Sequence, residues 1–520
     1  MKKIFNLISG LLFFTQINGQ VNLQLLGQLP FPGTTCAGVW HYVDSIGNEY
    51  ALVGAGNGIA IVDVTAPATP VLLFTVPAAQ SLWRELKTHN HYCYAGTEGG
   101  GGITIINLQY LPDSVQYKTW MGDSTITGQL SSSHTVGIAD GYLYVYGSNL
   151  FNGGAIIADI ATDPWNPHYV GNYSLNYIHD GYVRNDTLWA GEILAGQFSV
   201  VDVTNKSAPV LLATQTTPGA FCHNTWLSDN GKYLFTTDEV NGAPLGSFDI
   251  SDLANIKMVD TYFTNLIPGS PVHNTHVIND YLVNPSYGSQ ITIVDALHPD
   301  NLIEIASYPT GTSLCWEAIP YLPSGNIIAT TINDGLYIFS PYYVRACYLE
   351  GIVTDSVTAL PINTATVLIQ STTISTLSAL TGEYKTGIPD SGTYTVTVSK
   401  TGYFPKTITG VVLTTGNVTQ LDVKLLSLTF GIENVFNEEN LFEVIPNPFN
   451  SSFNLLLKGP FFSENTFMEI IDIAGKVIEQ IPLAGIEKIN LGGKLNTGIY
   501  FIRLYDGNFK SRPVKIAKVY

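Results

Sequence analysis

A short apolar pattern recurs seven times in the first two thirds of the chain, each copy ending in Asp or a substitute. The copies are GIAIVD (58–63), GITIIN (102–107), GAIIAD (154–159), QFSVVD (197–202), PLGSFD (244–249), QITIVD (290–295) and GLYIFS (335–340). The closing residues are 43 to 52 positions apart, the extremes being 159 to 202 and 107 to 159. A period of about 40–50 residues with several strands per unit is typical of propeller blades. The repeats predict a seven-bladed β-propeller over residues 20–341.

Each repeat has room for four strands, except the last. In the first repeat the strands are predicted at 39–43, 50–53, 59–64 and 71–76. The seventh copy has no outer strand before the chain leaves at Pro341. The segment 23–33 (LQLLGQLPFPG) resembles the outer strand at 209–219 (PVLLATQTTPG). We therefore expect the N-terminal strand to complete the seventh blade, which would remove two open sheet edges.

Two smaller β domains are predicted after the propeller. The first covers residues 345–427 and shows turn and strand signals at Gly351, Asp355, Pro361-Ile362, Gly382-Glu383-Tyr384, Gly392-Thr393-Tyr394 and Gly402-Tyr403. These positions resemble the carboxypeptidase regulatory-like, transthyretin-type β-sandwich. The resemblance implies a domain without a catalytic centre, which we interpret as a spacer, with an independent adhesive role as the alternative. Residues 428–441 are predicted to be a flexible linker.

The remaining segment, 442–520, carries three spaced motifs: Pro446-Asn447-Pro448-Phe449, a hairpin at Asp472–Gly475, and Gly498-Ile499-Tyr500. They resemble the C-terminal sorting domain of type IX secretion substrates. The resemblance implies the secretion machinery and its sorting protease as partners, and attachment to the outer membrane surface. If the domain is removed after export, we expect the cut in 428–441.

The N-terminal sequence is consistent with secretion. Lys2 and Lys3 precede an apolar run, Ile4 to Phe14, followed by small and polar residues. This pattern predicts a signal peptide at residues 1–19. No later segment is apolar enough over a sufficient length to span a membrane, so none is expected in the mature chain.

The net charge restricts the classes of ligand, and the cysteine count restricts the disulfide bonds. The formal net charge is −18, which disfavours nucleic acid and anionic membrane surfaces and leaves divalent cations and glycans. The five cysteines are an odd number, so at least one thiol must be free, and the spacing does not give a pairing.

The repeats also resemble a known family. The stretches 36–54, 82–86, 133–138, 177–183, 222–239 and 315–339 are similar to LVIVD-repeat proteins of the choice-of-anchor B family. The resemblance implies a propeller at the cell surface and supplies no activity.

An alignment of the inner strands suggests a site. Counting back 22 to 26 positions from each closing residue reaches only Trp or His: Trp40, Trp83, His134, His179, His223, His273 and Trp316. Polar residues follow, among them Asp180, Asn224 and Glu317. Because successive strand residues point to opposite faces, we expect only part of these polar neighbours to share the space of the ring.

Three interpretations of this ring remain open. Indole and imidazole groups at a channel mouth could bind a glycan or another surface molecule. His179 and His223, with Asp180 or Glu317, could instead hold a divalent metal ion. The residues could also only pin the inner strands.

No nucleotide-binding, nucleophile-elbow or zinc-protease motif occurs in a credible context. The pair Asp238-Glu239 could be half of an acid–base couple, but such pairs are usually solvated. The sequence therefore favours a secreted, surface-displayed binding or adhesion protein over the alternative, a secreted metal-dependent hydrolase or lyase that uses the histidines.

Overall fold

The computed structural model describes residues 22–428, 441–458, 466–506, 509–511 and 513–520. The predicted signal peptide, and the predicted linker between residues 429 and 440, lie outside these residues. The described residues form two compact units: residues 22–399 with 405–424, and residues 400–404 with the described part of 425–520. The described residues contain strands and two short 3-10 turns, and none forms a helix long and apolar enough to cross a membrane.

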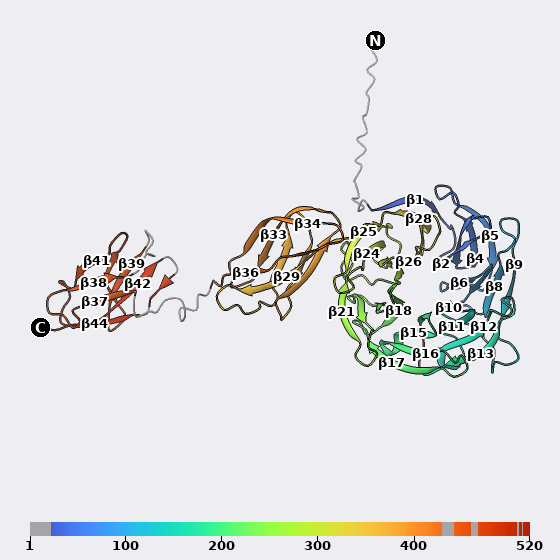
Figure 1. The fold of residues 1–520 in the computed structure, drawn as a ribbon, viewed down its shortest axis with the longest axis horizontal. Helices are drawn as coiled ribbons and strands as arrows, with labels where there is room; N and C mark the ends of the chain where they lie inside the picture. The colour runs from blue at the N-terminus through green and yellow to red at the C-terminus, as the bar shows by residue number, and fades with distance from the viewer. Residues whose placement is uncertain (1–21, 429–440, 459–465, 507–508, 512) are drawn as a thin grey trace, which may run out of the picture. The chain divides into compact units, whose positions relative to one another are not determined.

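Seven four-stranded antiparallel sheets surround a central axis, with strands such as β6, β10 and β26 nearest to it (Figure 1). Blades 1 to 3 consist of β2 (Cys36–Val43), β3 (Glu49–Ala55), β4 (Gly58–Asp63) and β5 (Val71–Pro77); β6 (Leu86–His89), β7 (Tyr92–Ala95), β8 (Ile103–Asn107) and β9 (Gln116–Trp120); and β10 (Thr135–Ala139), β11 (Tyr142–Tyr146), β12 (Ala155–Asp159) and β13 (His168–Tyr173).

Blades 4 to 6 consist of β14 (Asp180–Arg184), β15 (Thr187–Glu192), β16 (Gln197–Asp202) and β17 (Val210–Thr216); β18 (Cys222–Leu227), β19 (Tyr233–Asp238), β20 (Leu245–Asp249) and β21 (Lys257–Tyr262); and β22 (His276–Ile278), β23 (Tyr281–Ser286), β24 (Gln290–Asp295) and β25 (Ile303–Pro309). Blade 7 combines β26 (Cys315–Ile319), β27 (Ile327–Thr331) and β28 (Gly335–Pro341) with β1 (Leu23–Leu29).

The ring closes as predicted. Strand β1 pairs antiparallel with β28, with Leu25 opposite Phe339 and Leu29 opposite Leu336. The register shifts between Leu25 and Gly27. Gly27 lies so close to blade 1 that a Cβ there would stand 2.1 Å from the Pro67 carbonyl oxygen. Only glycine fits this contact without movement of the backbone.

The recurring apolar pattern produces the cores between blades. In β4, Ile59 and Ile61 pack toward blade 2, while Ala60 and Val62 pack toward blade 7. Because both faces of each sheet are buried, the third strands are apolar at nearly every position rather than alternating.

The sandwich that follows has two sheets of strand order β32-β29-β35, with β36 beside β29, and β31-β30-β33-β34. Its strands are β29 (Cys347–Asp355), β30 (Thr366–Ile369), β31 (Ser375–Leu377), β32 (Glu383–Ile388), β33 (Gly392–Ser399), β34 (Lys406–Leu413), β35 (Val418–Gln420) and β36 (Val423–Leu425). It packs on blade 6: the Arg345 guanidinium lies 2.6 Å from the buried Asp295 carboxylate, and Asn301 donates to Glu350 at 3.0 Å.

The C-terminal part of the second unit is also a two-sheet structure, of orders β37-β38-β41 and β40-β39-β42-β43, with β44 beside β42. Its strands are β37 (Phe442–Ile445), β38 (Phe453–Leu457), β39 (Phe467–Asp472), β40 (Val477–Pro482), β41 (Lys488–Leu491), β42 (Gly498–Asp506), β43 (Phe509–Lys510) and β44 (Val514–Lys518). Asp472 accepts from the backbone of Ala474 and Lys476 and so shapes the predicted hairpin. The predicted fold class, a seven-bladed propeller followed by two small β-sandwiches, is confirmed.

Candidate functional site

β-Bulges on the inner strands decide which side chains reach the channel. In β18, Cys222 pairs with Asp238 and Asn224 with Thr237, which leaves His223 as the extra residue. The same shift leaves Trp316 unpaired in β26. A bulge lets two consecutive side chains face the same side. His223 and Asn224 therefore line one cavity, as do Trp316 and Glu317, so the expectation that such neighbours point to opposite faces was wrong there.

Four predicted histidines do come together, on blades 3 to 6. We call His134, His179, His223 and His273 the histidine ring. Successive ring centroids are 3.8, 4.4 and 4.3 Å apart, and all four side chains are buried. Trp316 continues the series, 4.9 Å from His273. The inner-strand alignment is therefore correct over blades 3 to 7.

The structure does not bring Trp40 or Trp83 to this level. Trp40 lies farther along β2, where its ring is 6.0 Å from Tyr321. Trp83 precedes β6 and is 42 % exposed. By register, Ala37 and the buried Arg84 occupy the corresponding positions of blades 1 and 2. The three tryptophans therefore do not form the predicted aromatic arc.

Burial favours the neutral form of three members of the histidine ring, His179, His223 and His273. His273 Nδ1 donates to the Trp316 carbonyl oxygen at 2.6 Å, and His134 Nδ1 lies 2.6 Å from a Glu98 carboxylate oxygen. His179 Nδ1 is buried with no hydrogen-bond partner among the described residues. Burial, then the neighbouring histidines, lowers the pKa of His179 and of His223 well below the usual value. Burial also lowers the pKa of His273, although Glu239 opposes the shift.

Two acidic residues that were not in the predicted site border the histidine ring. Glu239 approaches His223 Nε2 at 3.7 Å and His273 Nε2 at 3.9 Å, and its side chain is 26 % exposed. Glu98 is 41 % exposed beside His134. Both follow the second strands of their blades: Glu98 precedes His134 by 36 residues, and Glu239 follows His223 by 16. Asp238 is buried and accepts from the Gly219 and Phe221 backbones at 3.0 and 2.9 Å, so it holds a loop and is not solvated.

A polar belt lies one residue farther along the inner strands. Asn224 donates to Asp180 at 2.6 Å, Asn274 donates to Glu317 at 3.0 Å, and Trp316 donates to Glu85 at 2.5 Å. Burial and the charge of Glu317 raise the pKa of Glu85. The cavity between the belt and the histidine ring measures only about 20 Å³, so the belt separates the two ends of the channel. The predicted residues Asp180, Asn224 and Glu317 all belong to this belt.

The opposite end of the channel is lined by aromatic rings that we call the aromatic mouth: Trp40, Tyr182, Trp226 and Tyr321. The hollow there has a volume of about 560 Å³. Tyr182 lies 4.3 Å from Trp226, and Trp226 stacks on Tyr321 at 6.1 Å and 20°. The hollow of the aromatic mouth includes the ends of β10 and β14, whereas the histidine ring lies at the starts of the inner strands.

Cationic and polar groups border these rings. The Lys87 ammonium lies 3.9 Å over the Trp40 ring, and Arg184 donates to the backbones of Ser228 and Asp229. Burial, then the charge of Lys87, lowers the pKa of His41 to about 4, so that imidazole is neutral. The aromatic mouth thus combines apolar faces with a positive charge and hydrogen-bonding groups.

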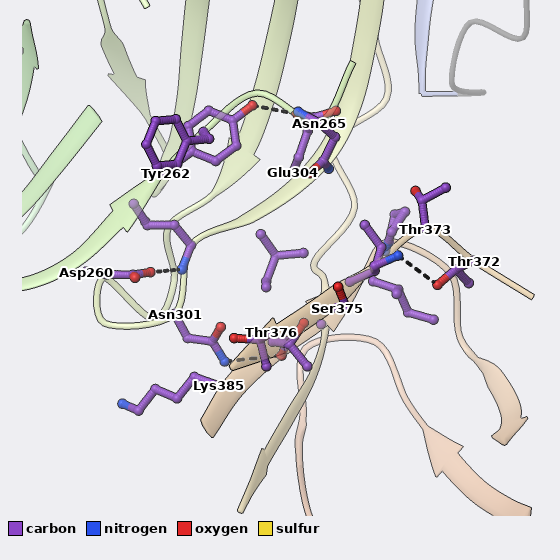
Figure 2. Close-up of a pocket in the computed structure, with 18 of the residues that line it drawn as sticks. Asp260, Tyr262, Asn265, Asn301, Glu304, Thr372, Thr373, Ser375, Thr376 and Lys385 are labelled. Carbon is purple, nitrogen blue, oxygen red and sulfur yellow. Dashed lines mark hydrogen bonds between the residues drawn. The ribbon is translucent and has the colours of Figure 1, made fainter. Parts of the chain in front are cut away.

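A further hollow of about 540 Å³ lies where the outer strands of blades 5 and 6 meet the carboxypeptidase-like sandwich (Figure 2). Two carboxylates in this hollow are hydrogen-bonded to other residues that line it. Glu304 accepts from Tyr262 at 2.6 Å and from the Asn265 backbone at 2.9 Å, and Asp260 accepts from the Leu302 backbone at 2.6 Å. We interpret this hollow as part of the joint between the two domains.

All five cysteines are free and buried. Burial raises the pKa of Cys36 to about 12, so this thiol is not poised for reaction.

Three family models match parts of the chain. Residues 45–77 and 194–217 match the LVIVD repeat, residues 348–426 the carboxypeptidase regulatory-like domain, and residues 443–517 the secretion system C-terminal sorting domain. Comparison with curated proteins gives no match. Among solved structures, the crystal structure of the WD40 beta propeller domain of Doa1 is 11 % identical, with 61 % of this chain and 96 % of that chain covered and a TM-score of 0.44. The sorting domain assigns the protein to type IX secretion and to the outer membrane surface, outside the cell.

Proposed function

We propose that this surface protein binds carbohydrate at the aromatic mouth of its propeller, as an adhesion or capture protein. The observation that carries the proposal is the hollow of about 560 Å³ lined by Trp40, Tyr182, Trp226 and Tyr321. Its volume lies in the range of small-ligand sites. Partly buried aromatic faces can pack against the apolar faces of sugar rings, while polar neighbours hydrogen-bond hydroxyl groups.

The charge of the aromatic mouth favours acidic sugars. The Lys87 ammonium over Trp40 and the Arg184 guanidinium border the hollow, together with one carboxylate, Asp140, so cations outnumber anions in its lining by one. A carboxylate on the ligand would gain a charge-assisted hydrogen bond in a partly desolvated site. The overall charge of −18 disfavours anionic ligands elsewhere on the surface, so this local positive charge supports selectivity.

Titration calorimetry with an oligogalacturonate and with its neutral methyl ester tests the proposal. We expect the acidic oligosaccharide to bind, the ester to bind more weakly, and Trp226→Ala to weaken binding at least about tenfold, or about 1.4 kcal/mol. Trp83→Ala is the matched control, because Trp83 is exposed outside the aromatic mouth.

The results test the charge argument and the carbohydrate site separately. Loss of binding in Lys87→Met with retention of the neutral ester would support the charge argument. Equal binding by wild type and Trp226→Ala, or no retention of any oligosaccharide by wild type, would refute a carbohydrate site at the aromatic mouth.

A further inference from the structure

The histidine ring has the chemistry of a metal site, at the other end of the channel from the aromatic mouth. We propose that His179, His223 and Glu239 bind a divalent transition-metal ion of the zinc type, with His273 Nε2 as the fourth ligand. This inference does not depend on carbohydrate binding.

The first support is the clustering of ligand atoms. One ligand atom each from His179, His223 and Glu239 lies within 4.8 Å of the others. Neighbouring ligands of a tetrahedral zinc ion lie about 3.4 Å apart, given metal–ligand distances of about 2.0–2.2 Å. His223 Nε2 and Glu239 are already 3.7 Å apart, so small side-chain rotations would complete the site.

The second support is an unfavourable contact that a cation would relieve. His273 donates its Nδ1 proton to the Trp316 carbonyl oxygen, and a neutral imidazole then has a lone pair on Nε2. This Nε2 lies 3.9 Å from a carboxylate oxygen of Glu239. Two electron-rich atoms repel each other, whereas a metal ion between them is attracted by both.

The third support is the arrangement around the ligands. Metal-binding histidines usually donate the other ring nitrogen to a carbonyl or a carboxylate. Of the proposed ligands, His273 does so to Trp316, whereas Nδ1 of His179 and of His223 is buried without a hydrogen-bond partner among the described residues. The partly exposed carboxylates of Glu98 and Glu239 give the ion a negatively charged entrance.

The set of ligands selects the class of metal. Imidazole nitrogen with one carboxylate suits zinc and its neighbours, whereas calcium and magnesium require oxygen ligands. The proposed ligands come from blades 4, 5 and 6, so the ion would link three blades and stabilise the ring.

The test uses the full secreted chain, purified without a metal-affinity tag and treated with a chelator. We expect one zinc ion per chain by elemental analysis after incubation with Zn²⁺ and dialysis. Because the ion binds only the folded protein, saturating zinc at about 100 times Kd should raise the Tm by about 4 °C. His179→Ala with His223→Ala should lose both effects, and the matched control, His89→Ala with His168→Ala, should retain both.

Glu239→Gln provides a second variant with little change of shape. It should fold normally and bind Zn²⁺ at least about tenfold more weakly. The inference is overturned if wild type binds no more zinc than the double variant, or if the control loses zinc equally, which would indicate adventitious surface binding. Trp226→Ala should bind zinc as wild type does, so failure of either site can be recognised separately.

Discussion

The ion pair between Arg345 and Asp295 gives the sharpest stability prediction. The Asp295 side chain is fully buried, lies 2.6 Å from Arg345, and accepts from the Ala346 backbone at 2.7 Å. Arg345→Met would leave this carboxylate in the protein interior without its cation. Such a loss typically costs about 3–5 kcal/mol. Because Arg345 itself is 26 % exposed, water can partly replace it, and we expect about 2–3 kcal/mol.

The expected shift in Tm follows from the size of the propeller. With an unfolding entropy of about 2.1 cal/mol/K per residue over roughly 320 residues, this loss lowers the Tm by about 3–5 °C. Differential scanning calorimetry measures it. Asp295→Asn in the same chain should restore part of the stability, since the amide carries no charge.

The Lys385–Asp300 ion pair at the same joint is the control. Both of its side chains are 40 % or more exposed, so Lys385→Met should cost at most about 1 kcal/mol. A shift below about 1 °C for Arg345→Met would show that burial of the Asp295 charge has been overestimated. Strictly additive losses in the double variant would refute the coupling.

Two further predictions concern the ring of blades. In the presence of chelator, stability should fall by about 2 kcal/mol between pH 6.5 and pH 5.5, because the pKa values of His179 and His223 are lowered in the folded state and the unfolded chain therefore binds more protons. Denaturant titrations across this range should show a flatter profile for His179→Gln with His223→Gln, and an unchanged profile would contradict it. Gly27→Val should lower the free energy of unfolding by about 1–3 kcal/mol, because the valine side chain would meet the Pro67 carbonyl. The control is Gln24→Val, at an exposed position of the same strand, which should be close to neutral. Equal losses for both variants would rule out this steric explanation.

The sequence was sufficient for the architecture because the seven apolar copies are both periodic and doubly buried. The strands predicted at 50–53 and 59–64 correspond to β3 and β4, and the segment at 23–33 supplies β1. Such agreement follows from local patterning, which the chain repeats in every blade.

The site was only partly predictable, because counting back from a closing residue ignores bulges and variable hairpins. The count reached His223 correctly but placed Trp40 three residues beyond its true equivalent, Ala37. The cysteines mark the equivalent positions more accurately than the count does. Cys222 directly precedes His223, Cys315 directly precedes Trp316, and Cys36 directly precedes Ala37.

The acidic partners could not be found from the same pattern. Glu239 was noted only as part of the pair Asp238-Glu239 and Glu98 was not noted, and only the closed ring brings them beside His273 and His134. The aromatic mouth likewise joins side chains of blades 1, 4, 5 and 7 that have no common spacing.

The pairing of β1 with β28 gives the propeller a seam that joins the two ends of its sequence, with Leu25 opposite Phe339. The two paired strands are more than 300 residues apart in the sequence, so blade 7 is expected to be the last blade to assemble, and to assemble slowly. Trimming by a protease up to residue 29 would leave every other strand covalently intact and yet expose β28 along its whole length. The stretch directly behind the predicted signal peptide is thus the place where a single cut would convert the closed ring into an open, self-associating one.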